Sequence, residues 1–161
     1  MMFGLFGKTF APQIRRLGVE DGADCAALHA SAFAFPWPQG DIEALLMART
    51  TVADGAFGSK TNDLQGFILC RLAADEGEIL TIAVAPRKRR KGLAARLLTA
   101  SIARLSALGA KSLFLEVEAE NTAARALYKR FGFEIVGERK SYYRKADGTT
   151  ALAYILRRPI I

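Results

Sequence analysis

With 161 residues, of which 51% are hydrophobic and 24% charged, the chain is long enough for one domain with its own core and too apolar for a disordered protein. No apolar run reaches the roughly 18 residues of a membrane span, and the N-terminus lacks the basic start and cleavage site of a secretion signal, so we expect a cytoplasmic protein with no membrane partner. The net charge of +7 favours an anionic partner such as a nucleic acid, a phosphorylated cofactor or an acidic surface.

Hydrophobic periodicity predicts seven strands and four helices. In chain order we expect a strand at 13–17, helices at 19–33 and 41–49, strands at 50–58, 64–72 and 79–84, a helix from Arg90 to Gly109, a strand at 111–121, a helix at 122–131, and strands at 133–139 and 150–156. The second half contains a strand-helix-strand unit, which should form a right-handed parallel crossover. The predicted fold class is α/β with a mixed sheet, in a single domain over residues 13–161 that follows an N-terminal extension over residues 1–12.

Several residues mark where these elements end. Gly109 and Gly132 stand where C-cap glycines belong, Asn121 is a good N-cap, and the pair Asp147-Gly148 predicts a tight turn. The nearly continuous apolar run over residues 79–84 predicts a strand buried on both faces. Helical spacing predicts one buried stripe on the third helix, formed by Leu93, Leu97, Leu98, Ile102 and Leu105.

The two cysteines and the one histidine are predicted to be structural residues. Cys25 and Cys70 lie far apart with no CxxC pattern, which favours buried reduced thiols over a disulfide. His29 falls within a helical pattern and has no metal-ligating neighbours in sequence. We therefore expect a packed or surface imidazole and no metal site.

A run of basic residues, Arg87–Lys91, joins the apolar strand that ends at Val84 to the helix predicted from Arg90. Free backbone N–H groups and the positive dipole end at the start of a helix form a site for an anion. Gly92 has no side chain to prevent the close approach of a phosphate. The position of the run between two core elements therefore predicts a phosphate-binding loop.

The side chains of this run leave two alternatives open. Arg89, Arg90 and Lys91 can make charge-assisted contacts with a phosphate, and Ala94 is nearly as small as a glycine. The same charges would suit a polybasic nuclear-localisation or nucleic-acid segment, or a solvated helix start with no ligand. Neither the P-loop pattern nor the dinucleotide-binding glycine pattern is present.

The spacing Arg89-x-x-Gly92-x-Ala94 resembles the acetyl-coenzyme A (acetyl-CoA) binding motif of the GNAT acyltransferase superfamily, and the segment LEVEAENTAARALYKRFGFE resembles the family's next strand and helix. Within the superfamily the chain is similar to the RimI type, which acetylates the N-terminal alanine of a small-subunit ribosomal protein. The segments that carry this likeness are FPW, LTIAV, LEVEAEN, ALYKRFGFE, RKSYY and DGTTALAYIL. Ala94 replaces a commoner glycine, and the apolar N-terminal extension is not expected of the family. The resemblance implies the GNAT fold, a mostly antiparallel seven-stranded sheet flanked by about four helices.

The resemblance implies acetyl-CoA as the co-substrate. Its extended pantetheine arm would pair with an exposed strand edge, much as a peptide does. The residues implied to bind it are Arg89, Arg90, Lys91, Gly92, Leu93 and Ala94, the backbone of Ile82, Ala83 and Val84, and the side chains of Asn121 and Tyr128. Helix capping alone would also explain Asn121.

Acetyl transfer to an amine needs a base for the amine proton and an acid for the departing thiolate. Glu116 and Glu118 project from the same face of a predicted strand, and either could take the proton. The resemblance places the base at Glu116 and the acid at Tyr128. The structural alternatives are a solvated strand face for the glutamates and a core position for the tyrosine.

The resemblance also indicates an aromatic groove for the acceptor peptide. Its walls would be Phe35, Trp37, Tyr142 and Tyr143, with Glu118 as a further contact. A structural role for Trp37 in closing the core is the alternative.

These residues predict an acetyl-CoA-dependent N-acetyltransferase that acts on the N-terminal α-amine of a protein, a ribosomal protein by resemblance. A weak base is sufficient to deprotonate an α-amine, because the pKa of an α-amine is about 7.7 to 8.0, against about 10.4 for a lysine side chain. The alternatives are acetylation of a small amine or a lysine side chain, and a non-catalytic module that binds RNA or the ribosome. Direct nucleic-acid binding is not expected for the enzyme, which we expect to be a monomer or a weak dimer.

Overall fold

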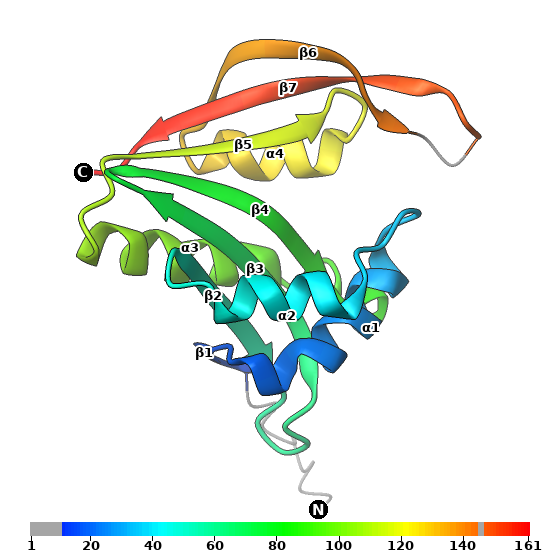
Figure 1. The fold of residues 1–161 in the computed structure, drawn as a ribbon, viewed down its shortest axis with the longest axis vertical. Coiled ribbons are helices and arrows are strands. Elements are labelled where there is room, and N and C mark those ends of the chain that lie inside the picture. The colour runs from blue at the N-terminus through cyan, green and yellow to red at the C-terminus, as the bar shows by residue number, and fades with distance from the viewer. Residues whose placement is uncertain (1–10, 145–146) are drawn as a thin grey trace, which may run out of the picture.

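The computed structural model describes residues 11–144 and 147–161, and for residues 141–144 it describes the backbone alone. Seven strands form one sheet in the order β1-β2-β3-β4-β5-β7-β6 (Figure 1). The strands are β1 (Gln13–Arg16), β2 (Thr51–Phe57), β3 (Leu64–Ala73), β4 (Glu76–Val84), β5 (Ser112–Glu118), β6 (Glu134–Arg144) and β7 (Thr150–Pro159). Only β4 and β5 pair in parallel, so the predicted mixed, mostly antiparallel seven-stranded sheet is confirmed.

Four α-helices cover the two faces of this sheet within the described residues (Figure 1). The helices are α1 (Gly22–Ala32), α2 (Gln39–Met47), α3 (Leu93–Ala107) and α4 (Thr122–Arg130). The hydrophobic core accordingly has two parts, one under α3 and α4 and the other under α1 and α2. None of the described helices is long and apolar enough to cross a membrane.

The central strands β4 and β5 pair only at one end. Glu76–Ile79 of β4 pairs with Ser112–Leu115 of β5, and beyond these residues the two strands diverge (Figure 1). On the other side of β4, Cys70 of β3 pairs with Ile79 while Leu69 pairs with Thr81, so Leu80 is the extra residue of a β-bulge. A bulge bends its strand and increases its twist, which carries the second half of β4 away from β5.

The apolar stripe predicted on α3 faces the core. Four of its five leucine and isoleucine side chains are buried, and Ile102 packs against them. Residues 79–84 of β4 pack on both faces of the sheet, as predicted. Ile79, Ile82 and Val84 pack in the core part under α3 and α4, and Leu80 and Ala83 pack in the part under α1 and α2. Buried and half-buried side chains alternate from Gly77 to Val84, and none is exposed.

Several element boundaries differ from the sequence prediction by a few residues, and two of these differences have a clear structural cause. The helix α3 begins at Leu93 and not near Arg90, because Arg90 and Gly92 both have left-handed backbone with φ of 61° and 75°. The strand β6 continues to Arg144 through residues predicted as a connecting segment, because their backbone pairs with β7. Of the predicted extension over residues 1–12, residues 1–10 lie outside the described part of the structure.

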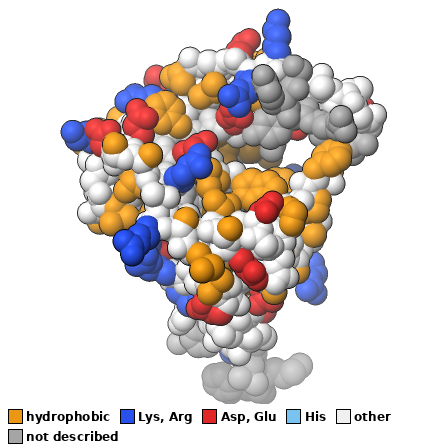
Figure 2. All heavy atoms as spheres, viewed as in Figure 1, with side chains coloured by type: hydrophobic (Ala, Val, Ile, Leu, Met, Phe, Trp, Pro, Cys, Tyr) orange, Lys and Arg blue, Asp and Glu red, His pale blue; other side chains and the backbone are white. Residues whose placement is uncertain are grey.

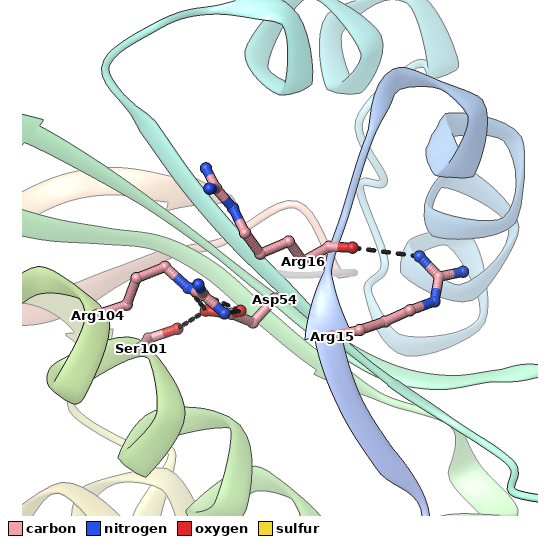
Figure 3. Close-up of polar contacts among 5 residues, drawn as sticks. All are labelled: Arg15, Arg16, Asp54, Ser101 and Arg104. Carbon is pink, nitrogen blue, oxygen red and sulfur yellow. Dashed lines mark hydrogen bonds and ion pairs between the residues drawn. The ribbon is translucent and has the colours of Figure 1, made fainter.

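A buried ion pair fixes α3 to β2. The carboxylate of Asp54 is fully buried and accepts hydrogen bonds from Arg104 Nη2 at 2.6 Å and from Ser101 Oγ at 3.0 Å. Figure 3 shows both side chains reaching from α3 to Asp54 on β2. Because two donors and one positive charge satisfy this carboxylate, the position of α3 on the sheet is fixed by more than apolar packing.

The substitution Asp54→Asn should lower the free energy of unfolding by about 3 kcal/mol, because it removes the buried carboxylate of the pair and leaves the partly exposed guanidinium of Arg104 without its anionic partner. Urea unfolding would measure the loss. The matched control is Glu78→Gln, which removes an exposed pair with Arg71 at 2.8 Å and should cost less than about 1 kcal/mol. Equal losses in the two variants would contradict a structural role for Asp54.

Candidate active site

The divergence of β4 and β5 opens a notch in the middle of the sheet. The residues Leu80–Val84 of β4 have no strand partner on the β5 side within the described sheet. These residues include Ile82, Ala83 and Val84, which the sequence predicts as backbone contacts of an extended ligand. An extended chain can pair with such an open strand edge. The geometry of β4 is therefore suited to that role.

The start of α3 offers free backbone donors beside the end of β4. The first helical bond runs from Arg96 N–H to the Gly92 carbonyl at 3.1 Å, so the N–H groups of residues 93–95 precede the helical bonding pattern. No side chain caps this end, and its first turn carries no acidic residue. The arrangement suits a phosphate, as the sequence predicts.

The basic residues before α3 are arranged around this helix start. Arg89, Arg90 and Lys91 are exposed, and Arg89 Nε donates to the Val84 carbonyl at 3.4 Å. Leu93 packs into the core with 5% of its surface exposed, so only its backbone can contact a ligand. The side chain of Ala94 is half-buried. The loop therefore presents positive side chains around a set of backbone N–H groups.

The two predicted catalytic side chains lie on opposite faces of the sheet. Tyr128 packs into the core under α3 and α4, together with Leu115 and Val117 of β5. Glu116 and Glu118 alternate with those residues along β5, so they point to the other face, where α1 and α2 lie. The unpaired edge of β4 faces β5, the strand that carries Glu116.

Glu116 has a partner that the sequence did not indicate. Its Oε1 lies 3.0 Å from Arg139 Nη1 on β6, and 24% of the Glu116 side chain is exposed. The strand β7 separates β5 from β6 in the sheet, so the pair forms across a strand. The guanidinium holds the carboxylate in a defined direction beside the notch. Glu118, two residues further along β5, is half-buried.

Tyr128 is a core residue as well as a candidate acid. It has 5% of its surface exposed and packs edge-on against Phe133 at 5.5 Å between ring centroids. Burial raises the pKa of its hydroxyl to about 12. The hydroxyl therefore stays protonated at neutral pH, which is the form that a proton donor needs.

Asn121 caps α4, as predicted. Its Oδ1 accepts a hydrogen bond from the Ala124 N–H at 3.2 Å. The residue is exposed, and this cap uses only the oxygen of the carboxamide. Its amide N–H groups are therefore compatible with the predicted second contact to a ligand.

The predicted acceptor wall lies between α1 and α2. Trp37 is half-buried and, with Asp41, Ala44 and Leu45, lines an open depression of about 420 Å³. Phe35 is 55% exposed. Figure 2 shows hydrophobic side chains gathered around a hollow between the β5-β7 strands and the helices α1 and α2. The backbone of Tyr142 and Tyr143 belongs to β6, but their side chains lie outside the described part of the structure.

The cysteines and the histidine are structural in the sense predicted. Cys25 and Cys70 are buried free thiols, and burial raises the pKa of each to about 12. His29 is buried and stacks on aromatic rings. Among the residues that the structure describes, no group of three or more His, Cys, Asp or Glu side chains is placed to hold a metal ion.

Comparison with known proteins identifies the family of this fold. Residues 23–133 match the model of the acetyltransferase (GNAT) family, and the chain belongs to that family and is an N-acetyltransferase. It is 37% identical over 98 residues, 61% of this chain and 68% of the relative, to the [ribosomal protein bS18]-alanine N-acetyltransferase of Haemophilus ducreyi. The crystal structure of the ribosomal-protein-S18-alanine N-acetyltransferase from Escherichia coli superposes with a TM-score of 0.86 at 30% identity, covering 92% of this chain and 93% of that one. Arabidopsis thaliana NAA60 in complex with acetyl-CoA shares the fold, with a TM-score of 0.81 at 20% identity over 92% of this chain and 98% of its own.

Substitution of Gly92 by alanine should lower the free energy of unfolding by about 1 kcal/mol, because an L side chain at φ of +75° is strained. Crowding is not the cause, since an added Cβ would meet nothing within 4 Å. Gly40 is the matched control, because its added Cβ is equally free and its backbone lies within α2. Gly40→Ala should stabilise the protein by up to about 1 kcal/mol. Equal stability of Gly92→Ala and the unsubstituted protein in urea unfolding would contradict the left-handed backbone at Gly92.

Proposed function

We propose that this N-acetyltransferase transfers the acetyl group of acetyl-CoA to the N-terminal α-amine of a protein, and that the acceptor is a ribosomal protein as the names of its relatives indicate. The observation that carries the proposal is the unpaired edge of β4 at the notch between β4 and β5, which leads to the phosphate-suited start of α3. The depression beside Trp37 would receive the acceptor. A donor with a phosphorylated end and a peptide acceptor could meet at this notch.

The residues around the notch fit acetyl-CoA. The loop Arg89–Ala94 would hold the phosphates through backbone N–H groups and positive side chains, and Gly92 leaves the space above it open. The open edge of β4 at Ile82–Val84 would pair with the amides of the pantetheine arm, and Asn121 would add a side-chain bond. When bound, acetyl-CoA supplies an activated acetyl thioester.

The proposed proton transfers use one residue from each face. Glu116 would accept the amine proton, directly or through a water molecule, while Arg139 keeps its carboxylate directed. Tyr128 would donate a proton to the departing sulfur from the other face. A protein α-amine, with a pKa of about 7.7 to 8.0, is mostly protonated at pH 7 but loses its proton far more readily than a lysine side chain, with a pKa of about 10.4, so a single carboxylate is a sufficient base.

The acceptor side of the notch is both apolar and acidic. Trp37 and Leu45 form an apolar wall, and Asp41 adds a carboxylate to it. Phe35 and Glu118 would extend this wall toward the notch, and Tyr142 and Tyr143 are proposed to complete it from β6. Such a wall suits an extended peptide that carries a free amine.

The function is tested with labelled acetyl-CoA and two peptides of one sequence, one with a free N-terminal alanine and one with that amine blocked. Label on the free peptide alone supports the proposal. Equal label on both peptides would show acetylation of a side chain such as lysine and contradict it. If neither peptide is labelled while calorimetry shows tight binding of acetyl-CoA, a small amine becomes the expected acceptor.

In the same assay, Tyr128→Phe should lower kcat by about 10²-fold or more, because it removes the proton donor for the departing thiolate. Acetyl-CoA affinity measured by calorimetry should change little. Tyr154→Phe is the matched control, since Tyr154 is a half-buried tyrosine of β7 stacked on Arg125. Wild-type turnover in Tyr128→Phe would remove Tyr128 as the acid.

A further inference from the structure

The buried imidazole of His29 lies between the proposed acceptor wall and the strand β4. The residue is 2% exposed and belongs to α1. Its ring stacks on Phe33 at 4.3 Å and on Trp37 at 5.0 Å between centroids. It also lies 6.4 Å from the ring of Phe67 on β3. His29 is therefore packed against both the loop that leaves α1 and the sheet beneath it.

Both ring nitrogens of His29 have partners, and these partners assign its tautomer. Nδ1 accepts a hydrogen bond from the backbone N–H of Trp37 at 3.2 Å, so Nδ1 carries no proton. The proton of the neutral ring is then on Nε2, which donates to Thr81 Oγ1 at 3.2 Å. Burial lowers the pKa of His29, which keeps the ring in this neutral form.

The two hydrogen-bond partners of His29 lie in the proposed binding sites of different substrates. Trp37 belongs to the loop Phe33–Trp37, which we call the acceptor segment. Thr81 follows the bulge residue Leu80 on β4, one residue before the proposed pantetheine contacts. Among the described residues, Ala34 to Trp37 form no backbone–backbone hydrogen bond, so the bond from the Trp37 N–H to His29 is a principal polar restraint on this segment.

We propose that His29 is a positioning residue that fixes the acceptor segment to β4 and thereby sets the affinity for the acceptor peptide. The inference rests on the proposed function, because it takes the acceptor to bind along Phe35 and Trp37. His29 touches neither reacting atom in this scheme. Its effect passes through the backbone of Trp37 on one side and the hydroxyl of Thr81 on the other.

Trp37 is the only tryptophan in the chain, so its fluorescence reports on the acceptor segment without any substrate. Four variants separate the contributions to its position. His29→Phe keeps an aromatic ring and loses both hydrogen bonds, while His29→Asn keeps an acceptor near Nδ1. Thr81→Val removes the partner on β4 with almost no change of shape, so it tests the link even if a change at His29 impairs folding. Thr99→Val alters an exposed threonine of α3 and is the control.

Acrylamide quenching of Trp37 should rise about twofold in His29→Phe and in Thr81→Val, and the acceptor KM should rise about tenfold, as expected for the loss of buried hydrogen bonds. We expect kcat to stay within about twofold, and the affinity for acetyl-CoA to be unchanged. His29→Asn should recover most of the affinity for the acceptor, because its amide oxygen can accept the Trp37 N–H. Thr99→Val should match the unsubstituted protein.

Unchanged quenching and unchanged KM in both His29→Phe and Thr81→Val would overturn the inference. A fall in kcat with KM unchanged would also overturn it, because a positioning role acts on acceptor binding. If the unsubstituted protein acetylates no peptide N-terminus, the proposed function fails, and with it the link to acceptor affinity. The quenching results then still decide whether His29 holds the segment.

Discussion

The parting of β4 from β5 is the constraint on which the rest of this structure depends. Two strands that pair over only four residues each leave one edge of β4 without a partner in the interior of the sheet. Buried backbone groups need hydrogen bonds, so such an edge is stable only where solvent or a ligand can reach it. The bulge at Leu80 marks where the strands begin to separate, and the proposed ligand contacts follow it directly.

The elements around the notch are held by interactions far from it. Asp54, Ser101 and Arg104 fix α3 to β2, which sets the position of the helix start that faces the notch. On the opposite face, His29 joins α1 to Thr81 of β4. The unpaired edge of β4 therefore lies between two layers that are each attached to the sheet by polar contacts as well as by apolar packing. Rigid support of this kind favours precise placement of reacting groups.

Local chemistry explains which features the sequence could predict. The α3 stripe and the Asn121 cap are set by neighbours within one helix or turn, so spacing alone indicates them. Arg90 shows the limit, because its left-handed backbone has no signal in the residue type and delays the start of α3. Contacts between distant segments had no sequence signal at all. The pair of Glu116 with Arg139 spans β7 and depends on the order of the strands β5, β7 and β6 in the sheet, and the link from His29 to Thr81 joins residues 52 positions apart.

The central claim is that the open edge of β4 and the start of α3 bind acetyl-CoA. Hydrogen exchange of backbone amides, followed by mass spectrometry with and without acetyl-CoA, tests it most directly. We expect acetyl-CoA to slow exchange in residues 80–84 and 92–95, and to leave the edge strand β1 unchanged. Unchanged exchange in both of these segments, or protection confined to β6 and β7, would contradict the claim.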